Sequence, residues 1–186
     1  MHHDKHLKKY VDTLNEILAD YPVYHTWSLE KLILSNSTLP PNIQTGVKNN
    51  AGGVYNHNLY FNIMKPDSQP NNPTGNLKEA IIKSFDSFEK FYNLFKEAAL
   101  KVFGSGYAWL VVGKDKELRI VISHNQDVPL NVFHVLLIDV WEHAYYLKYK
   151  NRRDEYINNW QNIIDWDKSE KNYNIAINYL NTAKTD

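Results

Sequence analysis

Apolar and polar positions at the start of the chain recur with the period of an α-helix. Between Lys5 and Asp20 this spacing predicts a helix with one apolar stripe, made of Leu7, Val11, Leu14 and Leu18. A second stripe starts at His2 and continues with His6 and Tyr10, each four residues after the last. The segment therefore pairs a core-facing side with a row of polar aromatic side chains.

Two more helices are predicted in the first third of the sequence. Ser28 is placed to cap a short apolar helix, and a proline pair suits the first turn of a longer one, predicted from Pro40 to Met64. His57 lies late in that longer helix. Two antiparallel helices could therefore bring His2 and His57 together.

A segment rich in proline, asparagine and serine, Lys65 to Gly75, interrupts the helical pattern. It is the best boundary in the sequence. We therefore predict an N-terminal helical-hairpin domain over residues 1–66 and a C-terminal domain over residues 67–186.

The C-terminal part contains segments with the periodicity of helices and segments typical of β-strands. Helices are predicted at Asn76 to Phe85, Ser87 to Phe103, Arg152 to Ile164 and Ser169 to Leu180. Between them lie β-rich runs at Tyr107 to Val112, Leu118 to Ser123 and Asn131 to Val140. The first two runs flank a hairpin signal, and the third carries Asp139 at its end, where side chains leave a sheet towards a site.

Composition narrows the class of protein. The chain has 186 residues, enough for a real core, and its 21 basic and 21 acidic residues give no signature of nucleic-acid or anionic-membrane binding. It has no cysteine, which excludes disulfides, thiolate metal sites and thiol nucleophiles. No apolar run approaches a membrane span and no signal-peptide pattern follows Met1, so we expect the cytosol.

Histidine and aspartate positions suggest chemistry. Asp139 and His143 are four residues apart, a spacing that lets a carboxylate and an imidazole converge on one ion. With the histidine clusters around His2 and His57, they could supply three imidazoles and one carboxylate to a single metal. Each residue alone is weak evidence, since most histidines in helices are structural.

Five blocks in order resemble the iron/manganese superoxide dismutase family over nearly the whole chain. They are His2 to His6 with Tyr10, Ala51 to His57, Phe103 to Leu110, Asn125 to Leu130, and Asp139 to Tyr146. The resemblance implies an α+β fold in which an N-terminal antiparallel helical hairpin precedes an α/β C-terminal domain with a small three-stranded antiparallel sheet.

The resemblance also implies a metal site with one manganese or iron ion per subunit. Its ligands would be His2, His57, Asp139 and His143, and a solvent molecule would complete five-coordination. The metal would cycle between the +3 and +2 states as superoxide becomes dioxygen and hydrogen peroxide.

Seven further residues would tune the potential, deliver protons or guide the substrate, by the same resemblance. Tyr10 would stand at the mouth of the substrate channel, and Gln126 would bond both that tyrosine and the bound solvent. Trp141 would seal the pocket. Three of the remaining four would act across the interface of a homodimer or homotetramer: His6 would contact Tyr146 of a second subunit, and Glu142 would contact His143 of that second subunit. Arg153 would lie near the entrance and attract the superoxide anion.

The metal preference follows from where the solvent-bonding glutamine lies. Manganese-type sequences combine glycine at the position of Gly53 with glutamine at the position of Gln126, as here, whereas iron-type sequences more often place glutamine at the earlier position. We therefore expect manganese, with iron as the alternative.

The sequence departs from the family pattern in places. Tyr107 and Phe61 stand where tryptophan is usual, and Leu7 replaces a frequent histidine; these changes should retune the pocket without removing the chemistry. The family also has a further segment before its first ligand, and we expect the true start to lie upstream. Two rival functions stay open: a catalytically impaired protein of this fold with an assembly role, and a zinc hydrolase, since three His and one Asp also suit zinc.

Overall fold

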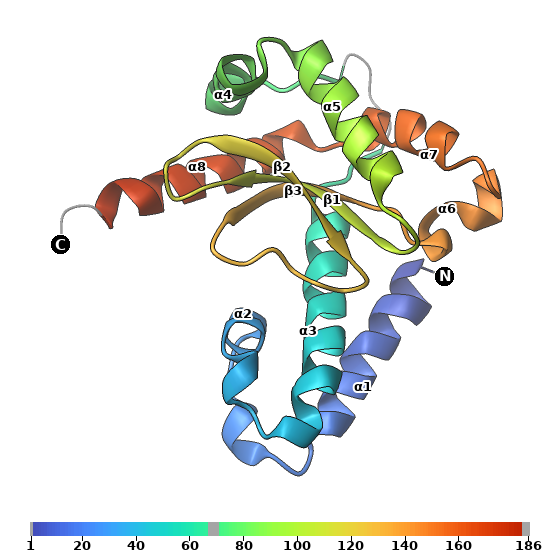
Figure 1. Ribbon diagram of the computed structural model, residues 1–186, viewed down its shortest axis with the longest axis vertical. Coiled ribbons are helices and arrows are strands. Elements are labelled where there is room, and N and C mark those ends of the chain that lie inside the picture. Colours follow the sequence, from blue (N-terminus) through green and yellow to red (C-terminus); the bar gives the residue numbers. More distant parts are fainter. Residues whose placement is uncertain (1, 67–70, 184–186) are drawn as a thin grey trace.

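The N-terminal part is a long helical hairpin. A computed structural model describes residues 2–66 and 71–183 (Figure 1). A π-helical turn, η1 (His2–Leu7), runs into α1 (Lys8–Leu18), which lies antiparallel to the long α3 (Pro41–Asn62). The expected stripe packs into this hairpin except at Val11, which is 36% exposed. The apolar stripe is therefore not buried along its whole length.

Short elements join the two long helices. They are η2 (Pro22–Tyr24), α2 (Leu29–Leu34) and η3 (Asn36–Thr38). Ser28 caps α2 as expected, since its hydroxyl accepts a hydrogen bond from the backbone N–H of Lys31 at 3.2 Å. Pro41 occupies the first turn of α3, where its missing N–H costs nothing. The helical hairpin buries its own apolar cluster, which includes Leu14, Leu32 and Val47.

The C-terminal part surrounds a three-stranded antiparallel sheet. Its strands are β1 (Gly106–Val112), β2 (Leu118–His124) and β3 (Phe133–Asp139), in the order β2-β1-β3. Helices α4 (Gly75–Phe85) and α5 (Phe88–Lys101) precede it, and α6 (Glu142–Tyr149), α7 (Arg153–Trp160), η4 (Gln161–Ile163) and α8 (Trp166–Thr182) follow. In Figure 1, α5 crosses one face of the sheet and α8 runs along β3.

Several element ends differ from expectation for local reasons. The third strand begins at Phe133, not Asn131, because Asn131 takes a positive φ of 62°. Helix α8 begins three residues early because Asp165 caps it by accepting from the N–H of Lys168. Helix α5 stops at Lys101, so Phe103 is not helical. Helix α6 was not predicted at all.

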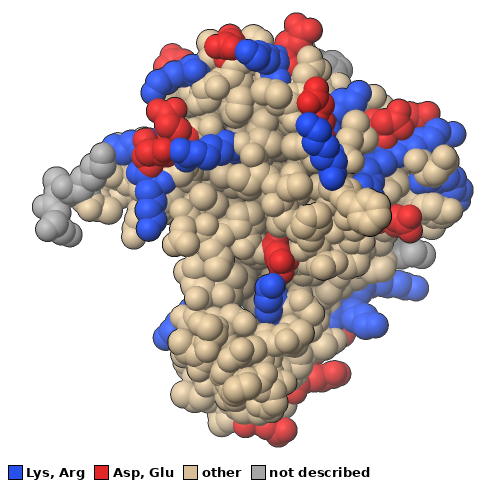
Figure 2. Space-filling model, in the orientation of Figure 1, with Lys and Arg blue, Asp and Glu red and all other residues tan. Residues whose placement is uncertain are grey.

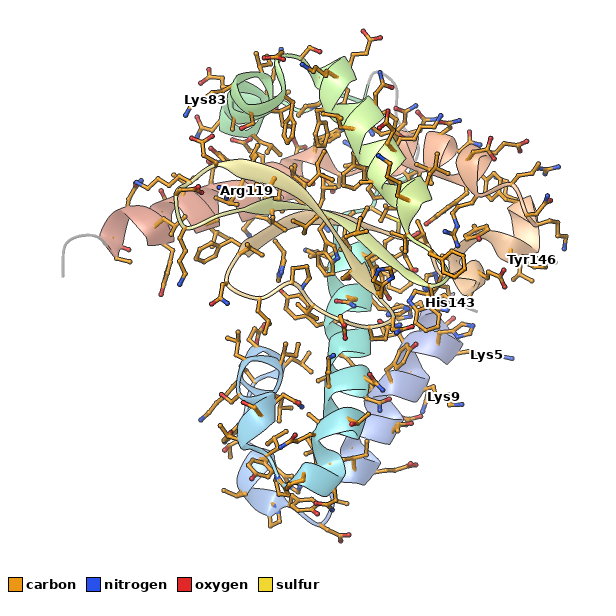
Figure 3. All side chains as sticks on the ribbon, viewed as in Figure 1. Lys5, Lys9, Lys83, Arg119, His143 and Tyr146 are labelled. Carbon is orange, nitrogen blue, oxygen red and sulfur yellow. The ribbon has the colours of Figure 1, made fainter. Side chains whose placement is uncertain are left out.

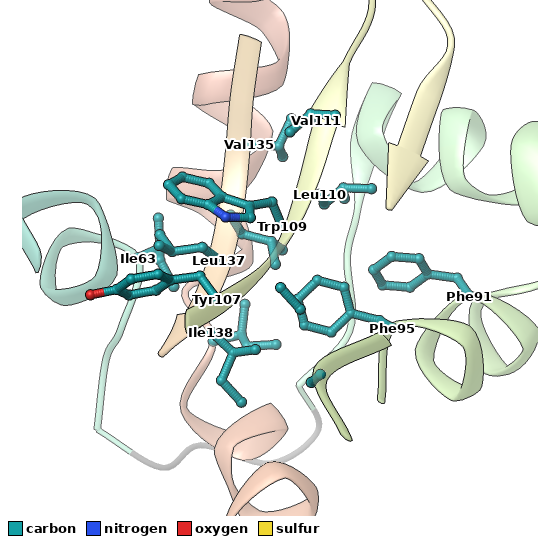
Figure 4. Packing of buried hydrophobic residues seen from close by; sticks show 14 of the residues in the cluster. Ile63, Phe91, Phe95, Tyr107, Trp109, Leu110, Val111, Val135, Leu137 and Ile138 are labelled. Atoms are coloured by element: carbon teal, nitrogen blue, oxygen red, sulfur yellow. The ribbon is translucent and has the colours of Figure 1, made fainter. Parts of the chain in front are cut away.

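The sheet lies in the main core. Every residue of the central strand β1 is buried, and Trp109 belongs to the same buried cluster as Ile63 and Leu137, which Figure 4 draws together. Because Ile63 follows α3, the end of the N-terminal hairpin is anchored in the C-terminal core. The division at residues 66 and 67 stays a prediction, and residues 67–70 lie outside the described part. No helix in the described ranges is long and apolar enough to cross a membrane.

Candidate metal centre

Four side chains from four separate elements meet at one point. They are His2 on η1, His57 on α3, Asp139 at the end of β3 and His143 in the first turn of α6. One potential ligand atom of each lies within 4.8 Å of all the others. Figure 3 labels His143 where these elements converge. The tertiary structure therefore assembles the ligand set that the resemblance implies.

The spacing of the polar atoms fits a metal ion better than it fits a hydrogen-bonded cluster. Oδ2 of Asp139 lies 3.3 Å from Nε2 of His2, 3.1 Å from Nε2 of His143 and 3.8 Å from Nε2 of His57. The Nε2 atoms of His57 and His143 are 3.3 Å apart. Nε2 of His2 is buried and, beyond its 3.3 Å approach to Oδ2 of Asp139, has no hydrogen-bond partner among the described residues. Such an orphaned nitrogen is costly unless an ion accepts its lone pair.

The tautomer of His57 supports this assignment. Its Nδ1–H donates to the carbonyl oxygen of Gly53 at 2.7 Å, which leaves a lone pair on Nε2, aimed at the cluster. Burial lowers the pKa of His57 to about 4, although the negative charge of Asp139 opposes the shift. The imidazole is therefore neutral at physiological pH, as a metal ligand must be.

Asp139 is held as a carboxylate although it is fully buried. Burial by itself raises its pKa, but the imidazoles of His143 and His2 beside it stabilise the carboxylate, outweigh burial and hold the pKa at about 2. Its Oδ1 accepts from the backbone N–H of Trp141 at 2.8 Å. The carboxylate thus keeps one oxygen, Oδ2, directed at the three imidazoles.

A hydrogen-bonded chain of side chains borders the four ligands. Nε2 of Gln126 donates to the hydroxyl of Tyr10 at 2.9 Å. Its Oε1 accepts from the hydroxyl of Tyr107 at 2.8 Å and from Nδ2 of Asn56 at 3.3 Å. Two donors on Oε1 fix which way the amide points. Burial raises the pKa of Tyr10, so its hydroxyl stays protonated.

Two adjacent glycines on α3 allow this chain to form. A Cβ on Gly53 would lie 2.6 Å from the ring of Tyr10, and one on Gly52 would lie 2.2 Å from the carbonyl oxygen of Gln126. Both positions therefore require glycine for close approach rather than for backbone conformation. The loop after β2 and the ring of Tyr10 both rest directly on the backbone of α3.

The other predicted site residues divide into three groups. His6 and Trp141 stack on the ring of His143, with ring centroids 4.5 and 5.4 Å away. Glu142 and Tyr146 have exposed side chains on α6. Arg153 donates to the carbonyl oxygens of Val102 and Gly104, each at 2.8 Å, and to the hydroxyl of Tyr145.

Three residues near the site had not been predicted. The hydroxyl of Tyr156 donates to the backbone carbonyl of Asp139 at 2.8 Å and is 2.8 Å from the hydroxyl of Tyr60. Asn56 holds the loop of Gln126. Tyr60 lies one helical turn after His57, which was a usable signal, but nothing local to Tyr156 relates it to Asp139.

Comparisons with known proteins agree on one family. The family model described as iron/manganese superoxide dismutases, alpha-hairpin domain, matches residues 1–65, and the C-terminal domain of the same family matches residues 73–172. The superoxide dismutase [Mn] of Listeria monocytogenes is 45% identical over 178 residues, covering 95% of this chain and 87% of that protein.

Two other relatives give the same picture. Superoxide dismutase [Mn] 2 of Bacillus anthracis is 42% identical over 179 residues, covering 95% of this chain and 85% of the relative. Superoxide dismutase [Mn] 3 of Leptolyngbya boryana is 42% identical over 178 residues, covering 95% of this chain and 74% of the relative. With its four convergent ligands, this chain belongs to the iron/manganese superoxide dismutase family.

Proposed function

We propose that this protein is a superoxide dismutase that converts two superoxide anions and two protons into dioxygen and hydrogen peroxide. The observation that carries the proposal is the convergence of His2, His57, Asp139 and His143 within 4.8 Å. Three imidazoles and one carboxylate suit manganese or iron. When bound, such an ion supplies a centre that one superoxide reduces and the next reoxidises.

Manganese is the metal we expect in this site. Its relatives in Listeria, Bacillus and Leptolyngbya are named as manganese enzymes. Gly53 leaves no side chain where a glutamine would have to pass the ring of Tyr10, and Gln126 approaches from the loop after β2 instead. The arrangement that the sequence indicated thus has a steric basis in the packing of α3 against α1.

Proton delivery is the role we assign to Gln126 and Tyr10. Nε2 of Gln126 donates one hydrogen to the hydroxyl of Tyr10, and its second hydrogen is available to a solvent molecule at the metal centre. Tyr10 is partly exposed, so its protonated hydroxyl connects bulk water with the buried amide. Tyr107 and Asn56 hold that amide from behind. The rings of Trp141 and His6 cover His143 and limit access of water.

A homodimer is the minimal assembly that we propose, with a homotetramer as the larger form. Phe103 is 92% exposed and Leu147 is 71% exposed, which is unusual for such large apolar side chains. Arg153 connects the segment around Phe103 with α6, which carries Leu147. Its guanidinium donates to the carbonyl oxygens on either side of Phe103 and to the hydroxyl of Tyr145 on α6. Glu142 and Tyr146 belong to the same helix, where a second subunit would meet them.

Arg153 is the residue we propose for attracting the anion. It forms no ion pair with any described carboxylate, so its positive charge is not cancelled locally, although carbonyl oxygens hold its guanidinium in place.

The cytoplasm is the compartment we propose. Size-exclusion chromatography with light scattering tests the assembly, and immunodetection in fractionated cells tests the compartment.

Elemental analysis combined with a superoxide-dismutation assay tests the function. We expect manganese or iron at about one ion per subunit together with activity. Metal without activity would leave only the assembly role, and zinc alone would favour a hydrolase. His57→Ala should lose the metal, whereas the matched control His25→Ala should retain it, because His25 is exposed and bonds only the carbonyl oxygen of Leu18.

A further inference from the structure

A cavity separate from the metal centre lies where the two parts of the chain meet. Its volume is about 340 Å³, and its lining comes from α2, the start of β3, the loop before it, Tyr55 on α3 and one side of α8. In Figure 1, α2 lies below the β2–β3 connection and α8. None of the four metal ligands lines this cavity. Its size and position are those of a small-molecule site.

Most of the wall is apolar, and part of that surface is open to water. Leu34 is 62% exposed, Ile175 is 57% exposed and Leu130 is 47% exposed. Ile33 and Phe133 continue the apolar wall inwards. Figure 2 shows that charged side chains on the face in view gather mainly over the upper, C-terminal part. A ligand with an apolar body would therefore release water from these side chains on binding.

The polar floor of the cavity presents a hydrogen-bond acceptor. Nε2–H of His134 donates to the carbonyl oxygen of Pro129 at 2.8 Å. Burial lowers the pKa of His134, so its ring is neutral and its Nδ1 is an acceptor. The hydroxyl of Tyr55, 2.8 Å from that Nδ1, must then donate to it. The lone pairs of the Tyr55 oxygen remain for a ligand.

Two more acceptors face the same space. Nδ2 of Asn172 donates one hydrogen to the carbonyl oxygen of Val135 at 3.0 Å, and Oδ1 of Asn172 accepts no hydrogen bond from a described residue. Glu30 contributes a carboxylate and forms no ion pair with a described residue. The neighbouring Lys31 lies over the ring of Trp27, 4.2 Å from its centroid.

Positive charge is missing from this lining. No Lys or Arg contributes to the described wall of the cavity. An adjoining cavity of about 350 Å³ shares Ile33 and Leu34 and includes Lys48, but Asp127 lies 2.7 Å from that ammonium and offsets its charge. The net charge around the cavity is therefore that of Glu30, and Asn131 at the rim adds only a neutral amide.

We propose that this cavity binds a small organic ammonium ion with an aromatic or branched apolar body. An ammonium group carries three donors and no acceptor, which matches the acceptors of Tyr55, Asn172 and Glu30. Its positive charge complements Glu30, and its apolar body fills the space between α2 and α8. A carboxylate ligand would instead meet the like charge of Glu30 and the lone pairs of the Tyr55 oxygen.

Tryptamine, an ammonium ion on an indole body, is a suitable test ligand for the intact metal-loaded protein. We expect titration calorimetry to give a dissociation constant of about 1 mM or tighter. Indole-3-propionate has a similar shape and the opposite charge, and should bind at least about tenfold more weakly. Glu30→Gln should lower the affinity for tryptamine by about tenfold. Glu16 is an exposed carboxylate on α1, so Glu16→Gln should leave that affinity unchanged.

A second variant places a positive charge in the opening. Ile175 is exposed, so Ile175→Lys should fold normally and abolish tryptamine binding. Absence of tryptamine binding to the unmodified protein would overturn the proposal. So would equal binding of the anionic analogue, or unchanged affinity in both Glu30→Gln and Ile175→Lys. None of these measurements depends on dismutase activity, so this inference and the proposed function can fail separately.

Discussion

Replacing Gly53 by alanine tests how closely α1 and α3 must approach at the metal centre. A Cβ at this position would lie 2.6 Å from Cδ1 and Cγ of Tyr10 and 2.9 Å from Cδ2. Ordinary contacts begin at 3.4 Å, so the ring must move by several tenths of an ångström. Because Tyr10 accepts a hydrogen bond from Gln126 at 2.9 Å, that movement breaks or lengthens the bond.

Two costs and one gain set the expected change in the free energy of unfolding. Overpacking costs about 1 to 3 kcal/mol, and the weakened hydrogen bond costs about 0.5 to 1.5 kcal/mol. Alanine in a helix interior returns about 1 kcal/mol relative to glycine. Gly53→Ala should therefore lower the free energy of unfolding by about 1 to 3 kcal/mol. It should also slow dismutation about tenfold or more, since the proton donor is displaced.

Urea unfolding and a dismutation assay measure the two effects, and Gly46→Ala is the matched control. Gly46 lies in the same helix, but a Cβ there meets only the flexible tip of Ile17, at 2.8 Å. This control should be neutral or more stable by up to about 1 kcal/mol, with full activity. If Gly53→Ala is as stable and as active as Gly46→Ala, Tyr10 does not rest on Gly53 and the reasoning is refuted.

Three other changes probe the same centre. Gly52→Ala places a Cβ 2.2 Å from the backbone oxygen of Gln126, which cannot rotate away, so the free energy of unfolding should fall by about 3 kcal/mol or more in urea titrations. Tyr107→Phe leaves Asn56 as the remaining donor to Oε1 of Gln126; it should cost about 1 kcal/mol and shift the pH profile of activity, and an unchanged profile would contradict the positioning role. In the chelator-treated protein, burial holds the pKa of His57 at about 4, against about 6.5 when unfolded. The unfolded chain then binds more protons between these values, so this residue should lower stability by up to about 3 kcal/mol as pH drops from 6.5 to 4, and His57→Ala should flatten the slope by that amount.

Local patterns were sufficient wherever a residue's role depends on its neighbours in the chain. The apolar stripe containing Leu14 and Leu18 is buried, and Ser28 caps its helix. Asp139 ends its strand as predicted. These features follow from side-chain period and from caps, which act over a few residues. Helix α6 was not predicted, because its N-cap residue is Trp141, which forms no side-chain cap hydrogen bond and gives no local signal for a helix start.

Sequence by itself predicted the types and order of the candidate metal ligands, three histidines and one aspartate, and the pairing of Gln126 with Gly53. Only the tertiary structure decided that Gly52 and Gly53 are contact surfaces for Gln126 and Tyr10, and that Tyr156 supports Asp139 from a helix that follows it. Likewise, the acceptor-lined cavity exists because α2 and α8, distant in sequence, border the same loop. Such features depend on close approach between segments far apart in the chain, which packing of the whole core sets and no local pattern encodes.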